Sequence, residues 1–93
     1  MTPLSLDDFA PSVGERYEME VDGTVYPAEL IVASPLNDSG REGGSFRLEF
    51  RGPADPAFQQ GTFTFRRDGT EHAIFVVGIG RDEAGTRYEA VFF

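Results

Sequence analysis

The sequence predicts an all-β fold, a six-stranded antiparallel sandwich or small barrel with a short N-terminal helix. Three observations lead to this prediction. Apolar residues recur with a period of two along most of the chain, Gly and Pro separate the alternating runs, and two Asp-Gly pairs stand where tight hairpin turns are expected. With 93 residues, 40% of them hydrophobic, the chain suits a single domain over residues 1–93. Sandwich and barrel use the same hairpins, so the pattern leaves that choice open.

A short helix is expected near the start of the chain. Ser5 is a favourable N-cap, and Asp8 occupies the third helical position, from which its carboxylate can reach back to the cap. Pro11 disfavours helical geometry in the residue before it, and Gly14 permits a left-handed exit. The helix is therefore expected to make one or two turns.

Two strands joined by a tight turn follow, at residues 16–21 and 24–34. The first has apolar residues on one face and charged residues on the other, which is the pattern of a half-buried strand. Asp22-Gly23 between them supplies the positive φ angles of a two-residue hairpin turn. Pro27 has no N–H to donate, so the second strand is expected to be an edge or to carry a bulge there.

Four further strands are expected, at residues 45–51, 62–66, 71–80 and 87–93. The first two place phenylalanines on one face, and Asp68-Gly69 forms a second tight turn before the third. The strand at 71–80 is the most apolar and has apolar residues on both faces.

Composition excludes several classes of function. Sixteen acidic against eight basic residues give a net charge of -8, which repels nucleic acid and anionic membrane surfaces. The absence of cysteine excludes disulfides and thiolate chemistry. No apolar run is long enough for a membrane helix, and residues 1–6 do not resemble a signal peptide, so a cytoplasmic protein is expected.

No residue pattern predicts catalysis, a metal site or a cofactor. The glycine-rich loop at 37–44 leads into a strand and carries acids, unlike a phosphate-binding loop. Glu18 and Glu20 lie two residues apart, a spacing that sixteen acids produce by chance. His72 is the only histidine, and no serine stands in a nucleophile-elbow pattern. The chain is therefore expected not to be an enzyme.

A second set of apolar residues is the strongest indication of function. One sheet of a sandwich cannot leave all of them in water without forming a patch large enough to associate. Either the N-terminal helix, through Leu6 and Phe9, covers this set, or another protein does. The set comprises Val25, Ile31, Ile74, Val76, Val91 and Phe93.

The function predicted is a non-enzymatic protein-interaction module that binds a protein partner or itself. Aromatic, apolar and arginine side chains are the usual anchors of such contacts. The alternative is a small-ligand or carbohydrate-binding domain that stacks its ligand on Tyr17, Tyr26 or Tyr88, although all three fall on expected core faces. The candidate interface residues are Arg41, Ile74, Val76, Val91 and Phe93.

Three segments of the chain resemble a known family. They are residues 6–9 (Leu-Asp-Asp-Phe), 39–53, which run from Ser-Gly-Arg-Glu-Gly-Gly to Gly-Pro, and 88–92 (Tyr-Glu-Ala-Val-Phe). Together they resemble a family of bacterial domains of unknown function, about ninety residues long. The resemblance implies a small bacterial protein with gene neighbours similar to phage-tail-collar or tail-fibre proteins. It implies no catalytic residue.

Overall fold

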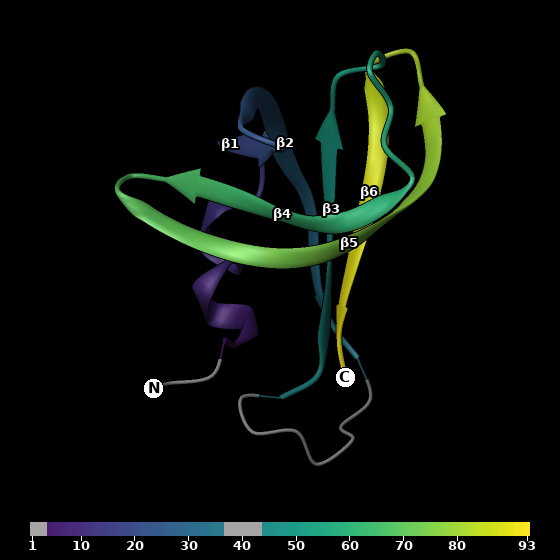
Figure 1. Ribbon diagram of the computed structural model, residues 1–93. Helices are drawn as coiled ribbons and strands as arrows, with labels where there is room; N and C mark the ends of the chain where they lie inside the picture. The colour runs from purple at the N-terminus through teal and green to yellow at the C-terminus, as the bar shows by residue number, and fades with distance from the viewer. Residues whose placement is uncertain (1–3, 37–43) are drawn as a thin grey trace.

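The computed structural model describes residues 4–36 and 44–93, and it shows a closed antiparallel β-barrel (Figure 1). Around the barrel the strands follow the order β1-β2-β3-β6-β5-β4. This confirms the all-β prediction and selects the barrel over the sandwich. The strands are β1 (Arg16–Val21), β2 (Thr24–Pro35), β3 (Phe46–Gly52), β4 (Gln60–Arg67), β5 (Thr70–Asp82) and β6 (Gly85–Phe92).

Two tight turns fix the register of the hairpins. Asp22 and Gly23 have φ angles of 50° and 83°, and Asp68 and Gly69 have 53° and 79°. These positive values are what a two-residue turn between right-twisted strands requires. The turns pair Val21 with Thr24 in the β1–β2 hairpin and, in the β4–β5 hairpin, Arg67 with Thr70.

At one end of the barrel β5 separates from β6, because β5 changes its pairing partner along its length; we call this end the split end. The first part of β5 pairs with β4 up to Val77, and the part from Val77 onward pairs with β6. A β-bulge between Gly78 and Gly80 marks this change. In Figure 1 the β4–β5 hairpin accordingly crosses in front of β3 and β6 and projects away from them. Pro27 lies in the part of β2 that pairs with β1 only. It is therefore at an edge on its other side, as expected for a residue without an N–H to donate.

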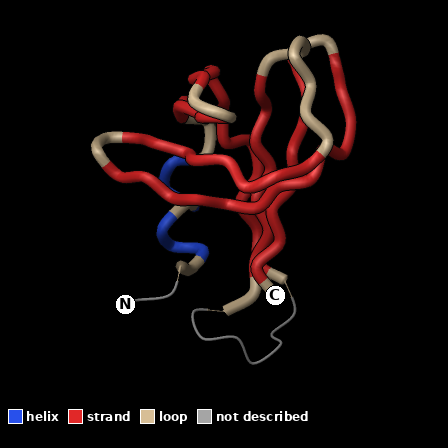
Figure 2. Tube along the Cα trace, in the orientation of Figure 1, coloured by secondary structure: helices blue, strands red, loops and turns tan. Residues whose placement is uncertain are grey.

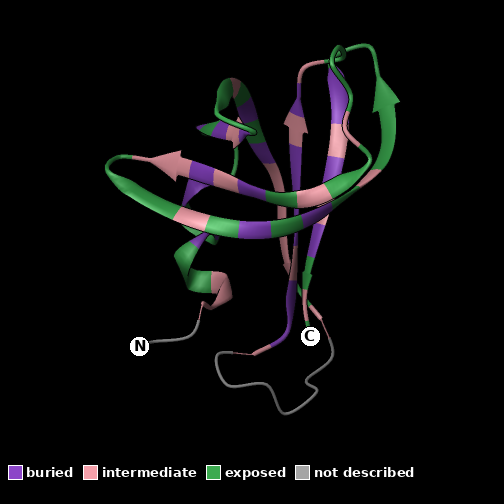
Figure 3. Ribbon diagram, in the orientation of Figure 1, coloured by how far each residue is buried: buried purple, intermediate pink, exposed green. Residues whose placement is uncertain are grey.

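Side chains fill the inside of the barrel. In the middle of β5, exposed and buried residues alternate, as the change of colour in Figure 3 shows. Phenylalanine rings stack across the core, with 4.1 Å between the ring centres of Phe50 and Phe65. Within the described residues the buried apolar side chains are Phe9, Tyr17, Met19, Val21, Ala28, Leu30, Phe46, Leu48, Phe50, Phe63, Phe65, Ile74, Val76, Tyr88 and Ala90.

The N-terminal segment closes the split end. It forms two short 3-10 helical turns, Leu6–Asp8 and Ala10–Ser12, which confirm the short N-terminal helix expected from the sequence (Figure 2). Its Ser5 N–H donates to the Asp8 carboxylate at 2.8 Å, as expected of the cap. Phe9 is fully buried, with its ring centre 5.2 Å from that of His72 and 6.1 Å from that of Phe46. The segment therefore fills the gap between β5 and the β3–β6 pair.

The loop before β4 closes the other end of the barrel. Phe58 packs its ring against Tyr26 and Phe63, with centres 5.6 and 5.5 Å apart. Its backbone N–H donates to the hydroxyl of Tyr88 at 2.9 Å. A buried tyrosine hydroxyl needs such a partner. In the described part of the chain, no helix has both the length and the apolar character to cross a membrane.

Candidate functional site

Four large apolar side chains lie on the outside of β5 and β6, and we call them the apolar strip. The strip consists of Phe75, Val77 and Ile79 of β5 and Val91 of β6, with exposed fractions of 55%, 40%, 41% and 54%. Phe75, Val77 and Ile79 lie on the outer face of β5, and Val91 lies on the outer face of β6, two residues beyond Glu89, which is paired with Val77. Phe93 extends this surface just beyond β6 and is 70% exposed.

The opposite face of β5 belongs to the core, which corrects the interface expected from the sequence. Ile74 and Val76 are only 2% and 0% exposed, so the expectation that they face outward is wrong. The physical reason is the register of the hairpin: Phe63 is paired with Ile74, and paired residues of antiparallel strands point to the same face. Val91 and Phe93 are exposed, whereas Arg41 lies outside the described residues.

The N-terminal segment leaves the strip open to solvent. Phe9, which was one of the side chains expected to cover the second apolar set, points into the barrel. The remaining members of that set differ: Val25 is 50% exposed on β2, and Ile31 is half-buried where β2 carries a bulge. The N-terminal segment therefore does not cover the strip. Contact with another protein is the other way, expected from the sequence, in which this apolar surface would be removed from water.

A hollow of about 530 Å³ lies beside the strip. Gly78 lets the loop before β4 approach β5 closely, because a Cβ atom there would stand 2.8 Å from the backbone oxygen of Phe58. The Gly78 N–H donates to the backbone oxygen of Gln59, which holds the loop against β5. Lining residues are Ala57, Phe58, Gln59 and Gln60 from the loop and β4, and Val77, Gly78, Gly80, Arg81 and Thr86 from β5 and β6.

Ion pairs cover the outer face of β3 and β6 next to the strip. The carboxylate of Glu49 accepts from Arg47 at 3.2 Å and from Arg87 at 3.3 Å, and Arg47 also reaches Glu89 at 2.8 Å. The hydrogen bond with Glu89, followed by the contacts with Glu49, raises the pKa of Arg47 above its ordinary value. Because each charge has a partner of opposite sign, this surface beside the strip is close to neutral.

The negative charge that no arginine balances lies mostly in the N-terminal segment, β1 and β2. Residues 1–35 contain seven acids and one arginine, whereas residues 36–93 contain nine acids and seven arginines. Residues 1–35 therefore carry -6 of the net charge of -8. Glu18 and Glu20 of β1 and Glu29 of β2 follow the expected outward face of these strands. In the order around the barrel, β2 lies three strands from β5 in either direction.

The residues weighed for catalysis do not form a site. Glu20 is bound by Arg66, whose other partner is Glu71, and these hydrogen bonds raise the pKa of the arginine. His72 is half-buried against the ring of Phe9. Among the residues that the structure describes, no three His, Asp or Glu side chains lie close enough together to hold a metal ion.

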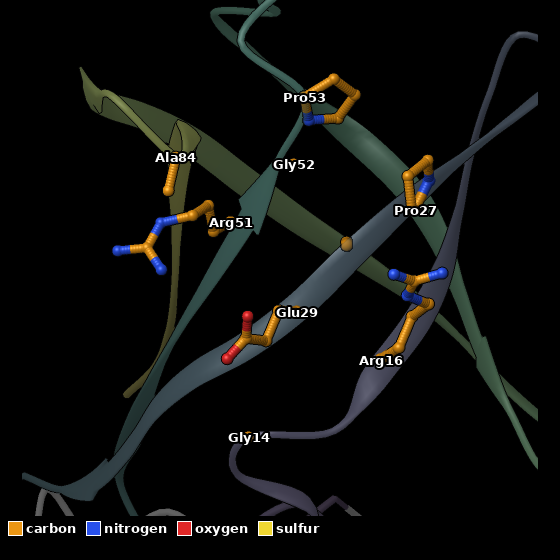
Figure 4. Close-up of a pocket in the computed structure, with 9 residues that line it drawn as sticks. Gly14, Arg16, Pro27, Glu29, Arg51, Gly52, Pro53 and Ala84 are labelled. Atoms are coloured by element: carbon orange, nitrogen blue, oxygen red, sulfur yellow. The ribbon is translucent and has the colours of Figure 1, made fainter.

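An open pocket of about 380 Å³ on β1, β2 and β3 is lined by Arg16, Glu29 and Arg51 (Figure 4). The two arginines do not converge on it. Figure 4 shows Arg51 extending past Ala84, where it pairs with Asp82 at 3.1 Å, and Arg16 extending toward Pro27. A ligand site needs polar groups that converge on one position. This pocket therefore indicates no class of ligand.

The fold and the surface together define a small closed β-barrel with one apolar, neutral flank. Comparison with known proteins gives the family: the chain matches the domain of unknown function DUF6916 over residues 4–92 and belongs to that family. No curated protein and no solved structure matches the chain. The expectation of a small domain of unknown function is confirmed, and the family assigns no site residue.

Proposed function

We propose that this domain is a non-enzymatic protein-interaction module that binds its partner through the apolar strip. The observation that carries the proposal is the position of Phe75, Val77, Ile79 and Val91 on one outer face, each at least 40% exposed. Single exposed apolar residues are normal on a protein surface, but a contiguous group marks an interaction site.

The size of the strip supports this function. Covering an aromatic residue buries 150–250 Å², so the 55% exposure of Phe75 corresponds to about 100 Å² of surface. On the same basis the four side chains present roughly 300–400 Å² of apolar surface, as much as the largest functional patch of many monomers. An aromatic ring with aliphatic neighbours is also the usual composition of an interface centre.

The surroundings of the strip favour a protein over other partners. A net charge of -8 repels nucleic acid and anionic lipid. Next to the strip, Gln60 and Thr62 of β4 are paired with Val77 and Phe75, so the flank on that side is polar without charge. Polar residues that can donate and accept hydrogen bonds are typical of an interface rim.

The carbohydrate-binding alternative loses its stacking residues. Tyr17 and Tyr88 are 5% and 0% exposed, and Tyr26 packs against Phe58. Tyr17 and Tyr88 therefore offer no ring face to a sugar, and Tyr26 is half-buried. The resemblance to a bacterial family with tail-fibre-like gene neighbours instead suggests an accessory role beside a larger structural protein, and we include this role in the proposal.

Site-specific crosslinking tests the proposed function. A photo-crosslinking amino acid at Val91, introduced in the cell that makes the protein, is expected to give one product of defined mass. The matched control is the same amino acid at Val25, which is 50% exposed on β2 and is expected to give no product. Phe75→Arg in the Val91 background should remove the product. Equal labelling at both positions, or none at Val91, would contradict the proposal.

A further inference from the structure

We infer that the partner of this domain supplies an extended segment, which binds as an added strand along residues 70–76 of β5. We call this stretch the free edge. The inference rests on the proposed function and names the chemistry of the partner. It is carried by the backbone N–H and C=O groups of Glu71, Ala73 and Phe75, which face a side of β5 where no strand lies.

The free edge is paired with a strand on one side only. From Thr70 to Val77, β5 pairs with β4, whereas β6 pairs with β5 only from Val77 onward. The N-terminal segment fills the gap with the side chain of Phe9, but no backbone hydrogen bond of its described residues goes to β5. In Figure 1, β5 accordingly forms the outer margin of the β4–β5 hairpin between the turn and its crossing over β6.

Alternate residues of the free edge direct their backbone groups away from β4. Successive residues of a strand direct their N–H and C=O groups to opposite edges. The Gly78 N–H donates to the Gln59 backbone oxygen on the side of β4, so the even-numbered residues of this stretch face β4. Glu71, Ala73 and Phe75 therefore face the open side. Within the described part of the chain, these backbone groups have no hydrogen-bond partner.

The side chains on the free edge leave it accessible. Glu71 and Ala73 are exposed, and Phe75 is 55% exposed. Proteins commonly protect an unpaired edge with proline, and β2 follows this rule, because Pro27 lies where β2 pairs with β1 only. The free edge of β5 contains no proline. It is therefore suited to strand addition, in which main-chain hydrogen bonds provide the affinity.

The apolar strip predicts the side chains at one end of the added segment. Val77 is paired with Glu89, and two residues further along each strand stand Phe75 and Val91. Both are exposed where β5 and β6 separate. A segment bound along the free edge comes up to this gap, so that an outward side chain at its end can contact both. We expect that side chain to be apolar.

The charges near the β4–β5 turn predict the other end of the segment. Glu71 shares the guanidinium of Arg66 with Glu20, so one arginine serves two acids. Asp8, which lies near the start of β5, accepts its hydrogen bond from the Ser5 N–H. The chain as a whole carries a net charge of -8. A basic side chain is therefore expected at the end of the segment that lies beside the turn.

Crosslinks from two positions test for an extended segment. Benzoylphenylalanine, a photo-crosslinking amino acid, is introduced at Glu71 in one variant and at Phe75 in another, in the cell that makes the protein. These positions are about 13 Å apart along β5. Mass spectrometry is expected to find the two labels on one partner segment, about four residues apart, because a paired strand advances in step with β5. Labels on separate segments, or about nine residues apart as a helix would give, would overturn the inference.

Proline at Ala73 tests the backbone contacts. Ala73→Pro removes an N–H that faces the open side and puts the proline ring in its place, while the hydrogen bonds with β4 remain. The yield of the crosslinked product at Val91 is expected to fall at least about 10-fold. The matched control is Ala73→Val, which adds a side chain of similar size and keeps the N–H, so its yield should stay near that of wild type. Equal yields from the two variants would contradict strand addition.

Hydrogen exchange in the wild-type product keeps the test independent of how well the proline variant folds. The Glu71, Ala73 and Phe75 amides are expected to exchange rapidly in the free protein and at least about 100-fold more slowly in the purified product crosslinked at Val91. The His72 and Ile74 amides face β4 and are the internal control, protected in both samples. Unchanged exchange at the first three amides would show that no strand is added there.

Failure of this inference can be distinguished from failure of the proposed function. A product at Val91 that persists undiminished in Ala73→Pro keeps the interaction module and excludes the added strand. No product at Val91 in the otherwise wild-type chain excludes both.

Discussion

Strands β1 and β5 lie in the same barrel, yet they present different surfaces to solvent. On β1 the inward residues are apolar and the outward ones, such as Glu18 and Glu20, are charged. On β5 the inward Val76 and the outward Phe75 and Val77 are all apolar. A strand with apolar residues on both faces is typical of one that is covered on both sides. The comparison supports our proposal that the outer face of β5 contacts a partner, whereas the outer face of β1 carries the charges expected of a surface in water.

The largest expected effect comes from placing a charge on each side of β5 in turn. Val76→Asp buries a carboxylate without a partner and is expected to cost about 4 kcal/mol or more, enough to unfold most of the protein. Val77→Asp, one residue along but on the outside, should change stability by less than about 1 kcal/mol. Chemical denaturation followed by circular dichroism measures both. Similar losses in the two variants would show that the sides of β5 are assigned incorrectly.

An intermediate effect is expected from removing carboxylates near the strip and on β1. The Glu49 side chain is only 9% exposed and stands between Arg47 and Arg87, so Glu49→Ala leaves two cations close together. It should cost about 1–2 kcal/mol. Glu20→Ala should cost about 0.5 kcal/mol or less, because Glu20 is one-third exposed and Arg66 keeps Glu71. Urea denaturation at neutral pH compares them, and an equal cost would mean that both surfaces are equally solvated.

The smallest effect concerns Asp82 at the end of β5. Desolvation alone would raise the pKa of this carboxyl, but hydrogen bonds from the Ala84 and Gly85 N–H groups and from Arg51 outweigh it and lower the pKa. A lowered pKa stabilises the fold above the unfolded value of about 3.9, and this stabilisation is lost as the pH falls through the folded value. Asp82→Asn should therefore be less stable than wild type at pH 7.

The difference between wild type and Asp82→Asn should shrink toward zero as the pH is lowered below about 4. Thermal denaturation at a series of pH values gives this difference directly. The Glu18→Gln variant on β1 is a control of the same charge change. A difference that grows with acidity would reverse the sign of the argument.

Much of the barrel could be predicted from the sequence because alternation and turn chemistry are local. The six strands, both Asp-Gly turns and the inward phenylalanines of β3 and β4 follow from these signals. The face of β5 could also have been derived. A two-residue turn at Asp68-Gly69 sets the register that pairs Phe63 with Ile74, which places both inside. Alternation alone could not decide this, since both faces of β5 are apolar.

Other features depend on contacts between distant parts of the chain. Closure of the barrel needs β6 to pair with both β3 and β5, and no local pattern specifies this. The position of Phe9 depends on the gap that the changing partners of β5 leave open. The hollow forms only where the loop before β4 approaches Gly78. These are the parts of the candidate site that sequence reasoning missed.

The insertion of β6 between β3 and β5 has a consequence for synthesis on the ribosome. β6 is the last strand to leave the exit tunnel, and its Phe92 lies 6.4 Å, ring centre to ring centre, from Phe9 at the other end of the chain. Nascent hairpins can form earlier, but the barrel cannot close until translation reaches this strand. A chain that stalls before β6 is therefore expected to remain an open substrate for chaperones and proteases.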